Sequence, residues 1–333
     1  MKLTGKRVMV TGGAGFIGSH LVDRLVANDN HVLIVDDFSF GKEENIAHHR
    51  GNPQVQIERA DICNLDEMIR LARGVDVILH LAVICLRTGL HDPLRAHRVN
   101  ATGSLYLCQA ALQNQIQRFL YVSTGEVYGS ALYYPIDEIH PMLPTNVYGA
   151  AKAAGELYAL SYHKTYGLPV SIVRLFNTYG PREQSEGRRA EVIPKFVLRT
   201  MAGLRPVIFG TGSQSRDFTY VEDIARGILL AAECDALVGH SVNLARGQDV
   251  SIATLCQLIL KKLGRLDLEP LFIPEGRPAD IEKIQANVGK AKQLLGFVAE
   301  TDIDAGLDRY IGWIQNQNWD LASWVKQDSI KNW

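Results

Sequence analysis

The fold is decided by the stretch Val10-Thr11-Gly12-Gly13-Ala14-Gly15-Phe16-Ile17-Gly18, which joins an apolar strand to an amphipathic helix. Within it, Gly13, Gly15 and Gly18 form the pattern G-x-G-x-x-G, which is meaningful because it lies between a strand and a helix. Such glycines permit a tight turn and let a pyrophosphate approach the positive end of the helix. The stretch predicts a dinucleotide-binding turn, with cofactor contacts from Gly12, Gly15, Phe16, Ile17 and Gly18.

Outward from this turn, apolar strands alternate with amphipathic helices. The pattern predicts strands over 7–11, 31–35, 55–58, 75–81, 118–123 and 170–175. Such alternation is typical of an α/β fold of the Rossmann type, a doubly wound parallel sheet with ligand sites at the carboxyl ends of its strands. After Asn177, prolines and glycines divide the chain into short segments. We expect these segments to form a smaller C-terminal substrate lobe.

Composition and charge exclude several classes of protein. The 333 residues are 47% hydrophobic, which is enough for a large core, and the formal net charge is -1. No global field therefore draws the protein to nucleic acid or anionic lipid, and the longest apolar run, over 75–86, is too short to cross a bilayer. The five cysteines lack a C-x-x-C pair, which argues against disulfides and a zinc site. We expect a cytoplasmic protein with no metal ion and no nucleic-acid or membrane partner.

Acidic residues follow the second and third predicted strands. Asp36 ends the second strand, where a carboxylate can accept both ribose hydroxyls of a dinucleotide. Its negative charge would meet the 2′-phosphate of NADP, so the sequence favours NAD as the cofactor. Asp61, in the turn after the third strand, could hold the adenine through its carboxylate.

A tyrosine and a lysine are spaced for acid–base chemistry. Tyr148 and Lys152 form a Y-x-x-x-K pair, and on a helix this spacing puts both side chains on one face. A free tyrosine has a pKa of about 10, so it is a poor base at neutral pH unless a cation such as Lys152 stabilises the phenolate. Thr124, after the strand over 118–123, adds a hydroxyl. These residues predict a proton-transfer site.

Together these motifs resemble the NAD-dependent epimerase/dehydratase family of extended short-chain dehydrogenases/reductases. The resemblance rests on G-x-x-G-x-x-G from Gly12, S-T-x-E-x-Y-G over Ser123–Gly129 and Y-x-x-x-K from Tyr148, and it covers nearly the whole chain. It implies that Tyr148 is the general acid/base, that Lys152 lowers its pKa and binds the nicotinamide ribose, and that Thr124 hydrogen-bonds the reacting sugar oxygen. By the same resemblance, the NAD site is completed by Asp61, Ile62, Leu81, Ala82 and Asn100.

Segments of the second half resemble the family's nucleotide-sugar site. The resemblance implies that Asn177, Arg216 and Arg277 hold a diphosphate, because guanidinium groups pair with phosphate oxygens bidentately. The other implied substrate contacts are Arg182, Val192 along the base, Asp280 on the nucleotide ribose, and Arg87 in the loop over 80–93 that covers the sugar. We expect an NAD-binding domain over 1–175 with a return segment near 215–235, and a nucleotide-sugar lobe mainly over 176–333. The resemblance also implies a homodimer, paired through the helix of Tyr148 and the helix after Asn100.

The reaction we expect is 4-epimerisation of a nucleotide sugar, with a UDP-sugar favoured, through a transient 4-keto sugar. The stretch Arg182-Glu183-Gln184 resembles the UDP-sugar 4-epimerase branch. Glu126 counts against a plain epimerase and leaves a 4,6-dehydratase or a UDP-glucuronate-type decarboxylase open, since those family members carry a glutamate there, where epimerases often carry a small or hydroxylated residue. Against these, Gly125 stands where glucose dehydratases have aspartate, although some mannose-type dehydratases also lack it, and Ile284 stands where decarboxylases have arginine. An NAD-binding sensor without chemistry is a further alternative, although the complete acid–base set argues against it.

Overall fold

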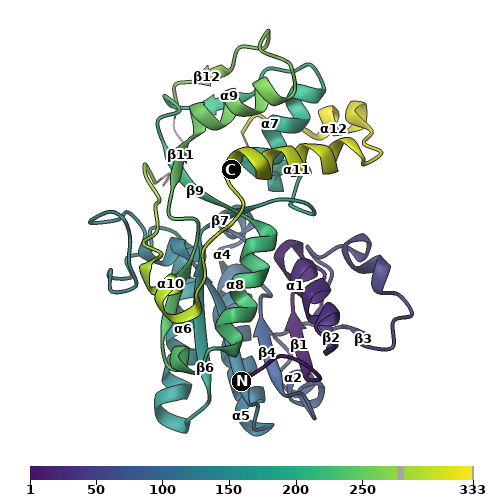
Figure 1. The fold of residues 1–333 in the computed structure, drawn as a ribbon, viewed down its shortest axis with the longest axis vertical. Coiled ribbons are helices and arrows are strands. Elements are labelled where there is room, and N and C mark those ends of the chain that lie inside the picture. Colours follow the sequence, from purple (N-terminus) through teal and green to yellow (C-terminus); the bar gives the residue numbers. More distant parts are fainter. Residues whose placement is uncertain (276–280, 332–333) are drawn as a thin grey trace.

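The computed structural model describes residues 1–275 and 281–331, and its core is a parallel sheet of seven strands (Figure 1). The strands lie in the order β10-β6-β5-β4-β1-β2-β3. The chain therefore winds outward in both directions from β1 and β4, as in a doubly wound dinucleotide-binding fold. The strands are β1 (Arg7–Thr11), β2 (His31–Asp36), β3 (Val55–Arg59), β4 (Val77–His80), β5 (Arg118–Thr124), β6 (Val170–Leu175) and β10 (Ser241–Leu244).

Helices cover both faces of this sheet because its strands are apolar on both sides. Val8 and Val10 of β1 pack in one cluster with α1 and α8, whereas Met9 between them packs in a second cluster with α2, α5 and α6. The main helices are α1 (Phe16–Ala27), α2 (Leu65–Leu71), α5 (Ser104–Gln113), α6 (Val147–Tyr166), α8 (Val221–Glu233) and α10 (Gly289–Leu295). Shorter segments are η1 (Glu43–His49), α3 (Leu86–His91), α4 (Pro93–His97), the π-helical η2 (Arg98–Gly103), η3 (Gly125–Tyr128) and η5 (Asp235–Leu237).

A smaller lobe lies beyond one end of the sheet, at the top of Figure 1. It has its own apolar cluster, in which Phe196, Leu255 and Tyr310 come from three different helices. The helical segments are η4 (Gly187–Arg189), α7 (Val192–Met201), α9 (Ile252–Lys262), α11 (Ile303–Gln315) and α12 (Leu321–Gln327). A three-stranded sheet joins β7 (Asn177–Tyr179), β9 (Ser215–Tyr220) and β11 (Asp249–Ser251), and β8 (Val207–Phe209) pairs with β12 (Leu271–Ile273).

The predicted fold class is confirmed. The strands β1 and β6 have the predicted bounds, while β4 is shorter than its apolar run over 75–81. Sequence analysis missed β10, which adds an edge strand beside β6 from far along the chain. Because β10 belongs to the sheet and α8 packs with α1, the N-terminal layers draw on the second half of the chain. The domain boundary at 175 stays a prediction.

Two further features concern membrane-spanning helices and disulfide bonds. Over the described residues, no helix combines the length and the apolar character needed to cross a membrane. All five cysteines are free thiols.

Candidate active site

A cavity of about 400 Å³ opens at the carboxyl ends of the strands and extends to the smaller lobe. Its volume suits a bound organic ligand. Its position agrees with the general rule for doubly wound sheets. The predicted site residues that line it are Gly12, Gly15, Phe16, Ile17, Gly18, Asp36, Asp61, Ile62, Leu81, Ala82, Thr124, Glu126, Tyr148, Lys152, Asn177 and Val192.

The glycine turn keeps one end of this cavity open. A Cβ atom on Gly12, whose φ is +71°, would lie 2.8 Å from the backbone nitrogen of Ala82. A Cβ atom on Gly18 would collide with the carbonyl oxygen of Gly12. Helix α1 begins at Phe16 without a side-chain cap, so its first-turn N–H groups can meet a phosphate.

Asp36 lies beside this turn and is only 7% exposed. The backbone N–H of Ala14 donates to its Oδ2 (3.0 Å), and that of Phe38 donates to its Oδ1 (2.9 Å). Burial raises the pKa of Asp36, although the two N–H donors oppose the shift. Each carboxylate oxygen has more than one acceptor position, so the fixed carboxylate can still receive ribose hydroxyls. The glycine cradle, the helix start and this acceptor together fit NAD.

Thr124, Tyr148 and Lys152, the residues predicted to be catalytic, lie together at one end of the cavity, called the catalytic end below. Thr124 ends β5, and the other two lie one turn apart in α6. The Nζ atom of Lys152 donates to the carbonyl oxygen of Val122 (2.6 Å) and lies 4.2 Å from the ring centroid of Tyr121. Burial lowers the pKa of Lys152 to about 7, with the charge of Glu156 opposing.

The surroundings of Tyr148 favour its neutral form over the phenolate. Burial raises the pKa of Tyr148, and a hydrogen bond with Thr124 opposes that shift. The nearby carboxylate of Glu126 raises the pKa further. Proton transfer through Tyr148 therefore depends on positive charge close to its oxygen, and we expect Lys152, one turn along α6, to supply it.

Glu126 is tied to the start of the helix that carries Tyr148. Its backbone N–H donates to Thr124 Oγ1 (3.2 Å), and its Oε2 accepts from the amide of Asn146 (3.0 Å). Asn146 in turn caps α6, because its Oδ1 accepts from the N–H of Gly149 (2.8 Å). Glu126 therefore helps to place Tyr148 as well as lining the cavity.

Asn100 acts behind the cavity wall. It is buried in the π-helical segment η2, and its amide exchanges two hydrogen bonds with the backbone of Ile84 (2.8 and 2.9 Å). Ile84 lines the cavity. Asn100 thus fixes the segment after β4 that forms one side of the site.

The predicted arginines are placed differently from the other site residues. Arg87 contacts the carbonyl oxygen of Ala190 and the Glu191 carboxylate, and Arg182, with φ +69°, pairs with Asp23. Arg216 donates to the carbonyl oxygen of Ser215 (2.8 Å). The structure does not bring these three into the described cavity wall, so their substrate contacts stay predictions. Arg277 and Asp280 lie outside the described residues.

Sequence reasoning missed several residues of the segment before α7. Glu183, Gln184 and Glu191 line the cavity, and Glu183 is 7% exposed. Burial raises the pKa of Glu183 well above its ordinary value. The resemblance singled out Arg182 and Val192, which lie next to these residues in the sequence. That was the signal that could have identified them.

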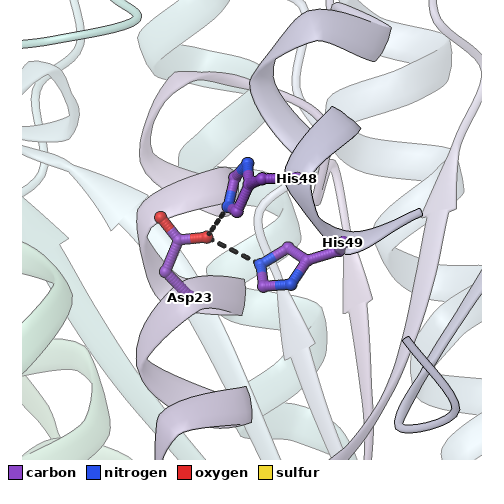
Figure 2. Close-up of side chains that lie close together, drawn as sticks. All are labelled: Asp23, His48 and His49. Carbon is purple, nitrogen blue, oxygen red and sulfur yellow. Dashed lines mark hydrogen bonds and ion pairs between the residues drawn. The ribbon is translucent and has the colours of Figure 1, made fainter. Parts of the chain in front are cut away.

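Figure 2 shows a cluster of Asp23, His48 and His49 in which α1 and η1 meet. His48 and His49 of η1 direct their Nε2 atoms at the same oxygen of Asp23 in α1 (2.7 and 2.8 Å). Arg182 takes the other oxygen (2.8 Å). With its two oxygens engaged, Asp23 links the first helix to η1 and to the segment over 182–189.

The same segment reaches across the cofactor end of the cavity. Gln184 donates to the carbonyl oxygen of Phe40 (3.1 Å), and Lys42 pairs with Glu186 (2.7 Å). Phe40 lines the cavity close to Asp36 in the wall. A dinucleotide bound there would be enclosed by contacts between the two parts of the chain.

NAD should therefore copurify with the protein, because these contacts must open before the cofactor leaves. We expect liquid chromatography of the denatured protein to yield NAD or NADH in amounts comparable to the protein. Recovery of NADP instead, with tight binding of NADP by the intact protein, would contradict the role of Asp36.

Comparisons with known proteins agree with this site. The family model of the NAD dependent epimerase/dehydratase family matches residues 8–245. The UDP-glucose 4-epimerase of Mycolicibacterium smegmatis is 33% identical over 315 residues, 94% of this chain and 99% of that protein. UDP-glucuronic acid decarboxylase 1 of Xenopus tropicalis is 32% identical over 319 residues, 94% of this chain and 73% of that protein.

A solved structure extends the likeness to three dimensions. The UDP-N-acetylglucosamine 4-epimerase from Methanobrevibacter ruminantium, in complex with UDP-N-acetylmuramic acid, superposes with a TM-score of 0.89 at 35% identity. The match covers 94% of this chain and 99% of that chain. The similarity therefore includes both the sheet and the smaller lobe.

Proposed function

This chain belongs to the NAD-dependent epimerase/dehydratase family, and we propose that it is a nucleotide-sugar 4-epimerase that acts through a transient 4-keto sugar. NAD bound in the cavity supplies the hydride acceptor and, later, the hydride donor at C4. Tyr148 removes the proton of the C4 hydroxyl, while Thr124 hydrogen-bonds the same oxygen and Lys152 stabilises the phenolate. The keto sugar then turns over, and Tyr148 returns the proton to the oxygen of the inverted centre.

One observation carries the choice of an epimerase over a dehydratase. Gly125 stands where glucose dehydratases of the family hold an aspartate, and a Cβ atom on it would lie 3.3 Å from the Phe176 ring. Phe176 is 6% exposed and lines the cavity. An aspartate at that position would press against this ring, which would have to shift by a few tenths of an ångström, so the chain neither carries the extra acid nor leaves open space for it.

The decarboxylase alternative lacks a matching cation. Ile284 lies in the cavity wall where decarboxylases of the family have an arginine, and it is 6% exposed. An apolar side chain there offers no charge to hold a sugar carboxylate. This observation favours a sugar that keeps its C6 group.

The partner we propose is a UDP-sugar, in keeping with the epimerases named above. Asn177 and Val192 line the cavity from the side of the smaller lobe, where a nucleotide would lie. We also propose a homodimer, because α6 presents Leu157 and Tyr158 at the surface, 53% and 39% exposed. The free thiols are compatible with the reducing cytoplasm that we propose as its location.

The test is incubation with UDP-, GDP-, CDP- and dTDP-sugars, followed by nuclear magnetic resonance of the products. Inversion at C4 of one sugar without loss of mass is the expected result. Release of carbon dioxide, or a stable 4-keto product, would replace the epimerase with a decarboxylase or a dehydratase.

Glu126→Gln distinguishes the epimerase from the dehydratase more sharply. An epimerase moves no proton at C5, and a glutamine oxygen can still accept the hydrogen bond from Asn146. We expect turnover to stay within about tenfold of wild type, whereas loss of a required acid or base costs roughly 100-fold or more. The measurement follows bound NADH by absorbance, together with solvent deuterium at C5.

A Glu126→Gln variant that binds the sugar but accumulates 4-keto sugar and NADH would sink the simple epimerase. Asn146→Asp is a useful companion, because it keeps the cap of α6 but places a second carboxylate beside Glu126.

A further inference from the structure

Arg87 and Glu191 join two segments that meet at the catalytic end of the cavity. Arg87 lies in α3 after β4, and its Nη2 is 2.7 Å from Glu191 Oε2. Its Nη1 donates to the carbonyl oxygen of Ala190. The Arg87 side chain is 11% exposed, whereas Glu191 is 42% exposed. The guanidinium of Arg87 is thus largely buried and is held by the segment of Ala190 and Glu191.

Glu191 is part of the cavity wall close to the reacting centre. It lines the cavity together with Tyr148, and its negative charge contributes to raising the pKa of Tyr148, after burial and Glu126. Among the described residues that line the cavity, Lys152 is the one with a cationic side chain. A charged group on C6 of a sugar whose C4 lies at Tyr148 would therefore meet carboxylates.

Glu183 adds a second carboxyl group to this wall. It receives the N–H of Gly180 at 3.3 Å, and it is buried. Burial and the charge of Glu191 raise the pKa of Glu183, while Arg87 opposes the shift. The charges of Glu191 and Arg87 therefore both affect the cavity wall, where the positive charge of Arg87 is balanced by Glu191.

We propose that Glu191 selects the substrate by holding Arg87 in the way a substrate carboxylate would, so that the site takes an uncharged hexose and rejects a uronic acid. The proposal rests on the proposed function and names its substrate class. Arg87 itself lies outside the described cavity wall, and once released from Glu191 its guanidinium would offer a bidentate fork to a carboxylate that enters beside Glu191. With Glu191 present, a uronate must bind beside a like charge, and the guanidinium of Arg87 is already paired. The specificity therefore comes from repulsion of the unwanted substrate.

The test is the ratio of kcat/KM for UDP-glucuronate to that for UDP-glucose. Glu191→Gln removes the competing charge and turns the ion pair with Arg87 into a weaker neutral hydrogen bond, so we expect the ratio to rise about 10- to 100-fold, the range of a charge-assisted hydrogen-bonded pair. Adding Arg87→Met to Glu191→Gln should abolish the gain. The matched control is Glu43→Gln, which removes a carboxylate that pairs with Arg50 on the surface and should leave the ratio unchanged.

Two results would overturn the proposal. One is a wild-type protein that prefers UDP-glucuronate, and the other is a folded Glu191→Gln variant whose ratio stays at the wild-type value. Circular dichroism and NAD content identify a folded variant. If Glu191→Gln does not fold, calorimetric binding of UDP-glucuronate and UDP-glucose to the wild type decides, since weaker binding of the uronate is required.

Failure of the proposed function gives a different pattern. A wild-type protein that converts no nucleotide sugar but binds UDP-glucose more tightly than UDP-glucuronate would refute the epimerase and keep the charge selection.

Discussion

Tyr148→Phe should lower turnover of the nucleotide sugar by about 100-fold or more. The substitution removes one oxygen from the first turn of α6 and keeps the ring. Burial already holds the pKa of Tyr148 above its ordinary value, so proton transfer through its oxygen depends on the neighbouring groups. Among the described residues, no other hydroxyl at the site lies one helical turn from Lys152. Thr124 alone cannot take over, since it lacks such a cation.

The affinity for the nucleotide sugar should change little in Tyr148→Phe, because the lost interaction matters most in the transition state. Steady-state kinetics and calorimetric binding of the same UDP-sugar separate the two effects. Tyr166→Phe is the matched control, since it removes a phenol oxygen from an exposed position at the other end of the same helix. Near-normal turnover in Tyr148→Phe would remove the mechanism proposed above.

The part of the site that sequence could predict is the part built from local geometry. A glycine turn between β1 and α1 has a fixed relation to Asp36, because β2 is the neighbour of β1 in the sheet. Tyr148 and Lys152 share a helix face by their spacing alone. The strand order and the helical period are enough to predict where such residues lie.

The arginines show where this reasoning ends. Long side chains reach several ångströms, and their partners are chosen by charge rather than by chain position. Arg87 meets Glu191, and Arg182 meets Asp23, across more than 100 residues of sequence in each case. Sequence motifs predicted that these guanidinium groups lie near the site, but their carboxylate partners depend on the packing of the smaller lobe.

The missed strand β10 has a similar cause. Its four residues, Ser241–Leu244, are too few for an alternation pattern to stand out. They enter the sheet because the edge of β6 offers unpaired backbone groups, and because α8 places them beside it. Tertiary contacts of this kind leave no local sequence signal.

Lys152→Met should abolish most activity and yet stabilise the cofactor-free protein at acidic pH. Turnover should fall by about 100-fold or more, because the phenolate of Tyr148 loses its cation. NAD retention should fall as well if Lys152 binds the nicotinamide ribose. The stability effect arises because Lys152 is 2% exposed and its charged form is poorly solvated.

The pH dependence has a definite sign. Burial lowers the pKa of Lys152 to about 7 from the ordinary value of 10.5. Below pH 7 both the folded and the unfolded chain hold the proton, so the cost of the buried charge is fully present. Above the folded pKa the unfolded chain binds more protons than the folded one, so the wild type gains stability with rising pH, by at most about 1.4 kcal/mol per pH unit from this residue.

Lys152→Met lacks this gain, so its stability advantage should be greatest below pH 7 and should shrink toward pH 10. Urea unfolding of both proteins, stripped of cofactor, is measured at several pH values. Groups that titrate alike in the two proteins cancel in the difference between their free energies of unfolding. The substitution also loses the hydrogen bond from Lys152 to Val122, which reduces the advantage equally at all pH values and leaves its slope unchanged. A difference that is constant with pH would show that Lys152 keeps an ordinary pKa in the folded protein, and the charge that Tyr148 needs would then be available without the cost of burial.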